Sequence, residues 1–139
     1  MGTETSYVEL DAKDVTENEL KIIEDKSNEL IAAATKVSVQ VCDKNDPALD
    51  SDVLRATRGL PDDHEGAIRI ITIHGVDSNM CCGTHVTNLS QLQIIKLLNV
   101  EKAKGKLLLH FLVGNRVNKK LSICYNREQQ LNLLLKYVT

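Results

Sequence analysis

The 139-residue chain is long enough for one domain, and its 42% apolar content allows a buried core built mainly from Leu, Ile and Val. Its net charge of −2, from 17 basic and 19 acidic residues, argues against salt-driven binding of nucleic acid by the whole surface. No apolar run is long enough to span a bilayer and no signal-peptide pattern is present, so we expect a cytoplasmic protein without membrane contact.

The first third of the chain predicts a strand, a helix and a second strand. Ser6 to Asp11 alternates apolar and polar residues as a short strand does. Thr16 and Glu19 form a capping-box pattern ahead of apolar residues at helical spacing, which predicts a helix from about Glu17 to Ala34. Lys36 to Cys42 predicts a half-buried strand with one apolar face, formed by Val37, Val39 and Val41.

The middle third predicts one strand between two loops. Asp43 to Glu65 is polar and contains both prolines, which is typical of a loop. Ala67 to His74 is rich in isoleucine and predicts a central strand. Gly75 to Asn88 carries Gly, Asp, Ser, Asn, Cys and Thr, and we expect a loop whose side chains are capable of chemistry.

The last third predicts a hairpin and a helix. Ser90 to Gln93 favours a short helical turn, and two apolar runs, Ile94 to Glu101 and Leu107 to Val113, favour an antiparallel hairpin with a basic tip. A helix over Leu89 to Leu98 fits the spacing almost as well. Arg127 to Tyr137 predicts a final helix. Because strands and helices do not alternate regularly, we expect an α+β fold with a mainly antiparallel sheet and one long helix packed on it.

One short segment contains residues that suit a metal. Cys81 and His85 are separated by three residues, and zinc accepts both thiolate and imidazole ligands. Gly83 allows a tight backbone between them, whereas Cys82 is expected to point the other way. Two ligands do not hold a zinc ion, so the spacing alone also allows Cys81 to be a small buried residue and His85 a hydrogen-bonded loop residue.

The sequence around this pair resembles a known family. Six blocks are similar to the eukaryotic alanyl-tRNA editing proteins: Tyr7 to Asp11, Arg58 to His64, Ile68 to Ile70, Asp77 to Val86, Asn88 to Ser90 and Phe111 to Val117. Those proteins are free-standing relatives of the second additional domain, the editing module of the class II alanyl- and threonyl-tRNA synthetases. The resemblance, which begins at Ser6, implies an N-terminally truncated member of the family.

That resemblance implies a division of the chain and an activity. Residues 1–117 would be the zinc-site half of the second additional domain, and residues 118–139 a helical tail. The family hydrolyses mischarged Ser-tRNA(Ala) in translation quality control, so the chain would be a zinc-dependent aminoacyl-tRNA hydrolase, a carboxylic ester hydrolase. Cys81 and His85 would be two of the four ligands of one Zn²⁺, and Gly83 and Thr84 would shape the site loop.

The chain departs from the family in its histidines. The family's other two ligands come from an H-x-x-x-H motif, and none of the four histidines here has another histidine four residues away. His64 and His74 are conceivable substitutes. The simpler interpretation is that His64 is an exposed loop residue and that His74 is a strand residue whose ring is hydrogen-bonded. His110 is expected to face away from the core.

Three explanations fit this departure. The chain could be a shortened form of an enzyme, or its site could be completed by homo- or hetero-association. It could also be a catalytically incomplete module that binds tRNA or a protein partner.

Basic residues of the second half are candidates for contact with the RNA backbone. They are Lys102, Lys104, Lys106 and Arg116. The competing interpretation is that they are ordinary solvated side chains at a hairpin tip and after a strand.

Overall fold

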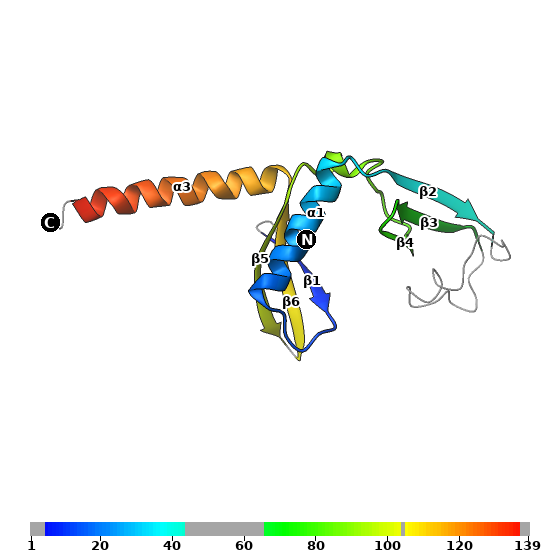
Figure 1. Cartoon of the computed structure of the whole chain (residues 1–139), viewed down its shortest axis with the longest axis horizontal. Helices are drawn as coiled ribbons and strands as arrows, with labels where there is room; N and C mark the ends of the chain where they lie inside the picture. The colour runs from blue at the N-terminus through cyan, green and yellow to red at the C-terminus, as the bar shows by residue number, and fades with distance from the viewer. Residues whose placement is uncertain (1–4, 44–65, 104, 137–139) are drawn as a thin grey trace. The chain divides into compact units, whose positions relative to one another are not determined.

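The computed structural model describes residues 5–43, 66–103 and 105–136. The chain divides into two compact units, one made of residues 1–31 and 92–139 and the other of residues 32–91. Each unit contains one three-stranded antiparallel sheet (Figure 1), which confirms the predicted α+β class. The loop predicted between Asp43 and Glu65 lies outside the described residues almost entirely, and the predicted boundary after residue 117 stays a prediction.

The sheet of the first unit has the strand order β1-β6-β5. β1 is Ser6–Leu10, β5 is Ile95–Ala103 and β6 is Lys106–Val113. β6 is central and carries the most deeply buried side chains, Leu107, Leu109 and Leu112. β5 and β6 pair as an antiparallel hairpin, so the hairpin predicted here is confirmed. The alternative helix over Leu89 to Leu98 is wrong, because only Leu89–Leu92 is helical, as the single 3₁₀ turn η1.

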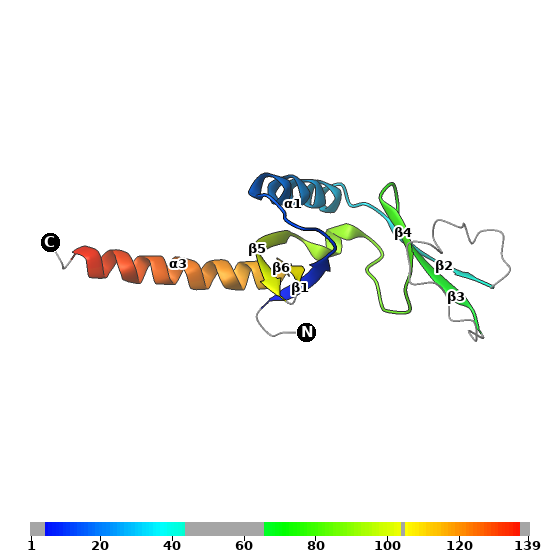
Figure 2. The ribbon, with the colours of Figure 1, turned by 90° about the horizontal axis from the view of Figure 1, so that it is seen from below.

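Helix α1 (Glu17–Ala32) lies against β5 (Figure 2) and occupies hydrogen-bonding groups along its outer edge. The Asn28 side chain donates to the Ile95 carbonyl at 2.9 Å and accepts from the Ile95 amide at 3.0 Å. The Glu24 carboxylate accepts from the Leu97 amide at 2.7 Å. Only Ile31 of α1 is buried, so these polar contacts, rather than a broad apolar face, join the helix to the strand.

The start of α1 is the predicted capping box. The Glu19 amide donates to the Thr16 hydroxyl at 3.2 Å, and the Glu19 carboxylate accepts from the Thr16 amide at 2.8 Å. The Thr16 hydroxyl also donates to that carboxylate at 2.7 Å. Because these bonds favour the ionised form, they lower the pKa of Glu19, with the backbone bond from Thr16 the largest cause.

Helix α3 (Asn115–Lys136) begins twelve residues before the predicted start of the final helix. Gly114 turns the chain from β6 into α3 with φ +62°, and a Cβ there would lie 3.3 Å from the Leu92 carbonyl oxygen, so both the backbone conformation and the close contact favour glycine. Residues after Gly114 contain no proline or glycine to interrupt the helix. α3 buries no residue in either half, and Figures 1 and 2 show it running away from the sheet of its own unit. Among the described residues, no helix has the length and apolarity needed to cross a membrane.

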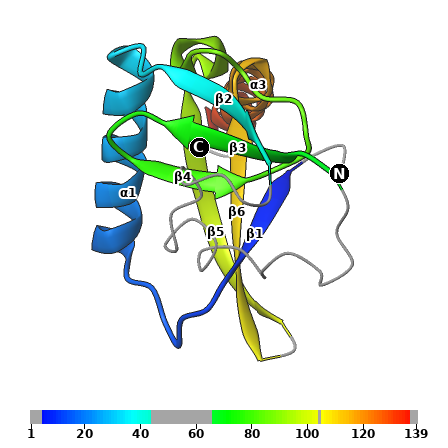
Figure 3. The same ribbon diagram turned by 90° about the vertical axis from the view of Figure 1, so that its right-hand side faces the viewer.

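The sheet of the second unit has the order β2-β3-β4 (Figure 3). β2 is Val37–Cys42, β3 is Ile68–Ile73 and β4 is Asp77–Met80. The predicted central strand is confirmed as β3, but β4 falls inside the predicted loop. β4 has only four residues, most of them polar, so an apolar alternation could not reveal it. A small core of Cys42, Ile68 and Ile70, with Met80 packed against it, holds the three strands together.

The predicted apolar face of β2 is wrong. Val37 is buried, but Val39 and Val41 are 47% and 64% exposed, while Cys42 is only 3% exposed. In the β2–β3 register Cys42 lies opposite Ile68 and Gln40 opposite Ile70, so the core lies on the face that Cys42 shares with those isoleucines. Alternation in the sequence identified the strand but selected the wrong side.

Loss of the Asn28 amide is expected to destabilise the first unit. Asn28→Ala leaves the partly buried Ile95 amide and carbonyl without their partner and is expected to lower the free energy of unfolding by about 1–3 kcal/mol. Chemical denaturation checks this, and hydrogen exchange should be faster at the Ile95 amide. Asn18→Ala on the exposed start of the same helix is the matched control. Equal stability of the two variants would contradict this role of Asn28.

The capping box is expected to make the start of α1 sensitive to acid. Because the pKa of Glu19 is lowered in the fold, its stabilising contribution is present above the ordinary Glu pKa and is lost as pH falls through the folded-state pKa. A carboxyl-detected NMR titration should give a Glu19 pKa below the ordinary value. In Thr16→Ala the pKa of Glu19 should rise only part of the way to the ordinary value, since the Thr16 backbone amide still donates to the carboxylate. If the titration midpoint of Glu19 is the same in Thr16→Ala as in the wild-type chain, the Thr16 hydroxyl does not contribute to the lowered pKa.

Candidate metal centre

The loop that carries the predicted metal ligands leaves the end of β4 and is held there by β3. The Cys81 amide donates to the Arg69 carbonyl at 3.0 Å, which extends the β3–β4 pairing one residue beyond the strand. The Arg69 guanidinium Nη1 donates to the Cys81 carbonyl at 3.0 Å and also to the Gly83 carbonyl. Three hydrogen bonds with Arg69, two donated by its side chain and one accepted by its carbonyl, therefore fix the start of the loop.

The other end of the loop is fixed by Asn88. Its side-chain amide donates to the Ala34 carbonyl at 2.8 Å, and its side-chain oxygen accepts from the Ser90 amide at 2.8 Å. Next to it, the Leu89 amide donates to the Thr35 carbonyl at 2.9 Å. Asn88 also forms a β-bridge with Lys36, just before β2. The loop from residue 81 to residue 88 is thus anchored to the second unit at both ends.

Cys81 and His85 lie on the same side of Gly83. A Cβ added at Gly83 would lie 3.6 Å from Cys81 Sγ and 3.9 Å from His85 Cε1. These are ordinary contact distances, so a small side chain would fit, but it would occupy the space that the sulfur and the ring share. Glycine leaves that space open. Cys81 is half-buried and His85 is exposed, so the pair is accessible from solvent.

A hydrogen bond to the Gly83 carbonyl orients the His85 ring. His85 Nδ1 lies 3.0 Å from the Gly83 carbonyl oxygen. A carbonyl can only accept, so Nδ1 carries the proton and the neutral ring has its lone pair on Nε2. This is the usual arrangement of a metal-binding histidine, which donates its second nitrogen to a carbonyl or carboxylate.

The donor set fits zinc as two ligands of four. A thiolate sulfur and an imidazole nitrogen are both zinc ligands, and a zinc site requires three or four. In the described ranges no three His, Cys, Asp or Glu side chains come together as a metal-binding group. Cys82 is exposed, as expected of a residue that points away, and Cys42 lies in the core beside Ile68.

The other described histidines have partners away from this pair. His74 Nε2 lies 2.9 Å from the Ser38 hydroxyl, as the simpler interpretation of a hydrogen-bonded strand residue predicted. His110 contacts Glu101 at 3.3 Å and the Tyr7 ring, in the first unit. His64 lies outside the described residues.

Two residues that build the loop were not singled out by sequence reasoning. Arg69 was noted only within the family blocks, although a charged residue between Ile68 and Ile70 is itself unusual in a central strand. Asn88 was likewise noted only as part of a family block, at the end of a polar stretch. Thr84, predicted to shape the loop, is exposed within it.

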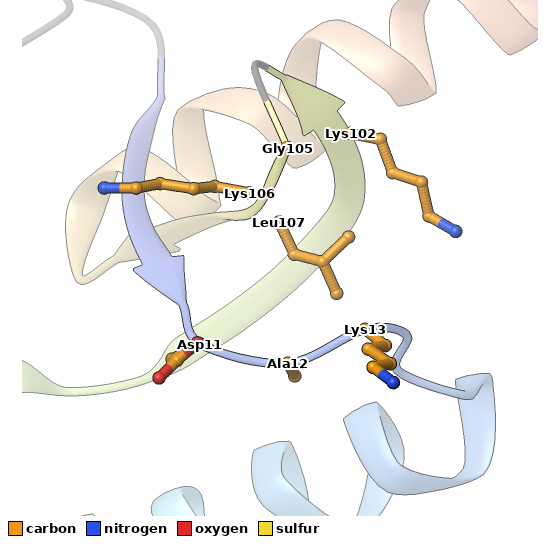
Figure 4. Close-up of a pocket in the computed structure, with 7 residues that line it drawn as sticks. All are labelled: Asp11, Ala12, Lys13, Lys102, Gly105, Lys106 and Leu107. Atoms are coloured by element: carbon orange, nitrogen blue, oxygen red, sulfur yellow. The ribbon is translucent and has the colours of Figure 1, made fainter.

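The predicted RNA-contact residues lie at the hairpin tip and at the start of α3. A hollow of about 530 Å³ is lined at this tip by Lys13, Lys102 and Lys106, together with Asp11, Ala12, Gly105 and Leu107. Figure 4 shows Lys106 extended to one side of the hollow and Lys102 to the other, so their ammonium groups do not converge. Lys104 lies outside the described residues, and Arg116 donates to the Ser6 hydroxyl at 3.1 Å.

Carboxylates accompany the lysines of the tip. Lys106 pairs with Glu9 of β1, and Lys102 lies 3.7 Å from Asp14. All four side chains are more than half exposed, and exposed ion pairs of this kind contribute at most about 1 kcal/mol each. A phosphate could therefore replace either carboxylate at little cost.

Residues 68–121 match the family model described as the threonyl and alanyl tRNA synthetase second additional domain. That range begins at β3 and contains the whole loop described above. The chain is 49% identical over 137 residues, 98% of its length, to the alanyl-tRNA editing protein Aarsd1 of Danio rerio. The corresponding protein of Mus musculus is 48% identical over the same share of the chain.

A more distant similarity links the chain to a synthetase. It is 28% identical over 123 residues, 88% of its length, to the alanine–tRNA ligase of Saccharolobus islandicus, and spans 13% of that enzyme. It spans 32% of the length of the zebrafish and mouse proteins. The resemblance expected from the family blocks is thus confirmed, and it continues beyond Val117 along α3.

Proposed function

We propose that this chain, which is similar along almost its whole length to alanyl-tRNA editing proteins, forms the zinc-binding part of a hydrolase that removes serine from mischarged Ser-tRNA(Ala) in the cytoplasm. The observation that carries the proposal is the Cys81–His85 pair. The two side chains share one side of Gly83, in a loop anchored at both ends, within the stretch that matches the second additional domain.

Cys81 Sγ and His85 Nε2 are the atoms that would hold the zinc ion. The hydrogen bond from His85 Nδ1 to the Gly83 carbonyl supports this role, since it leaves Nε2 as the ring's electron-pair donor. When bound, zinc supplies a Lewis acid that polarises the ester carbonyl or makes a bound water more acidic. The remaining ligands would come from outside the described residues of this chain or from a partner.

The reaction proposed is hydrolysis of the ester at the 3′ end of the tRNA. The oxygen of a water molecule bonds to the serine carbonyl carbon, the bond from that carbon to the ribose oxygen breaks, and the ribose oxygen takes up a proton. The products are serine and an uncharged tRNA. The residues of this chain would contribute orientation, because Arg69 and Asn88 hold the loop at its two ends.

A second candidate is a catalytically incomplete module that binds tRNA or a protein partner. It is favoured by the presence of only two suitable donors near each other among the described residues. Homo- or hetero-association could complete the site, and the exposed apolar side chains of α3 would suit a partner. They are Leu121, Ile123, Leu131, Leu133, Leu134 and Leu135. Zinc binding and turnover separate the two candidates.

The first test compares two neighbouring cysteines. We expect the purified chain to bind zinc and to release serine from Ser-tRNA(Ala), and we expect both properties to be lost in Cys81→Ala. Cys82→Ala is the matched control and should retain both, because its side chain is exposed and outside the proposed ligand set. Metal analysis and a deacylation assay with labelled serine provide the measurements. Zinc binding without turnover would support the module, and equal behaviour of the two variants would refute the zinc assignment.

The second test concerns the hairpin tip. The double substitution Lys102→Gln and Lys106→Gln should weaken tRNA binding and reduce the salt dependence of log K by about one for each lysine that contacts phosphate. The matched control is Lys21→Gln with Lys26→Gln, which removes two exposed, ion-paired lysines from α1. Binding constants measured from low to moderate salt give the slope of log K against log salt concentration for each double variant. Identical slopes for the two double variants would exclude the tip from the RNA interface.

A further inference from the structure

Arg69 is the one charged side chain on β3, the central strand of the second unit, and it contacts the loop that carries Cys81 and His85. It lies in β3 between the buried residues Ile68 and Ile70. Its guanidinium Nη1 donates to the carbonyls of both Cys81 and Gly83. No substrate or metal atom is needed to account for this contact, since both acceptors belong to the protein backbone.

The Gly83 carbonyl accepts two hydrogen bonds, and they link Arg69 to His85. One donor is Arg69 Nη1 and the other is His85 Nδ1, at 3.0 Å. A carbonyl oxygen has two lone pairs, so it can accept both at once. The direction of this carbonyl decides whether the imidazole keeps its proton on Nδ1. Arg69 fixes that direction.

We propose that Arg69 is a positioning residue for the metal centre, which sets the tautomer of His85 through the Gly83 carbonyl and holds the backbone of the loop at Cys81 and Gly83. The proposal rests on the proposed function, because it assigns Arg69 a role toward the metal that Cys81 and His85 would bind. The guanidinium suits this role, since it is always charged and its donors have a fixed geometry.

The consequence is a dependence of metal affinity on a residue that does not touch the metal. A group that hydrogen-bonds a metal ligand typically changes metal affinity by roughly 10–100-fold. Here that group is the Gly83 carbonyl, and Arg69 acts on it through a second hydrogen bond. Without Arg69 the Gly83 carbonyl would turn toward water, and His85 could place its proton on Nε2, the atom that must bind. Each metal-binding event would then require the ring to change tautomer first.

The test measures the tautomer before any metal is added. Long-range ¹H–¹⁵N NMR of the metal-free chain, at a pH above the range in which histidines protonate, distinguishes an Nδ1 proton from an Nε2 proton. The wild-type chain should hold the Nδ1 proton on His85. In Arg69→Met, which keeps an unbranched apolar stem, the population should shift toward the Nε2 proton. Co²⁺ titration, followed by the thiolate absorption of Cys81, should show affinity lowered by roughly 10–100-fold.

The matched control is Arg116→Met, which removes the other arginine with a described hydrogen bond, in the first unit. It should leave both the His85 tautomer and the Co²⁺ affinity unchanged. Amide spectra of β2, β3 and β4 report whether Arg69→Met keeps its sheet. If it does not, Arg69→Lys decides the question. This variant retains the charge but not the fork of donors, so His85 should move part of the way toward the Nε2 proton.

The outcomes separate this proposal from the proposed function. Retention of the Nδ1 proton in a folded Arg69 variant would overturn the positioning role, whatever the metal affinity. An altered tautomer with unchanged Co²⁺ affinity would also overturn it. If the wild-type chain binds no Co²⁺ or Zn²⁺, the proposed function fails at the metal, and the positioning of a ligand fails with it. If metal binds without turnover, only the hydrolase is lost.

Discussion

The second unit depends on the register of one strand, β3, which is hydrogen-bonded to β2 on one side and β4 on the other. Ile68 and Ile70 pack with Cys42 on one face, so a slip of one residue would turn Arg69 into that cluster. Because burial of the isoleucines fixes the register, it also fixes Arg69 opposite Cys81. The geometry of the Cys81–His85 pair is therefore determined by the packing of a strand that contains neither residue.

Much of the fold follows from local sequence. The capping box at Thr16, the isoleucine-rich strand β3 and the hairpin of β5 and β6 were all predicted, because each carries its own signal in adjacent residues. The exposed Val39 and Val41 were not, since alternation identifies two faces but not which of them is covered. The first half of α3 was missed although Val117, Leu121 and Cys124 recur at helical spacing, and no burial distinguishes it from the second half that was predicted.

The candidate site divides in the same way. Cys81 and His85 were predicted as zinc ligands because the segment around them resembles the editing family, since their spacing alone also allowed an interpretation without a metal. The contacts of Arg69 and Asn88 with backbone carbonyls could not be predicted, since each depends on which segments the sheet brings together. Arg69 is twelve residues from Cys81 and Asn88 is fifty-four from Ala34. A family resemblance can therefore indicate candidate ligands, whereas the groups that orient those residues depend on the fold.

The attachment of α1 to β5 affects whether a strand of another protein chain can pair with the edge of this sheet. A strand at the border of a sheet ordinarily offers free amides and carbonyls on which a foreign strand can add, and proteins avoid such growth by covering the border. Asn28 and Glu24 already engage Ile95 and Leu97, so an incoming strand would have to displace a helix before it could pair there. Two polar side chains thus act as a barrier to sheet extension and aggregation along this border.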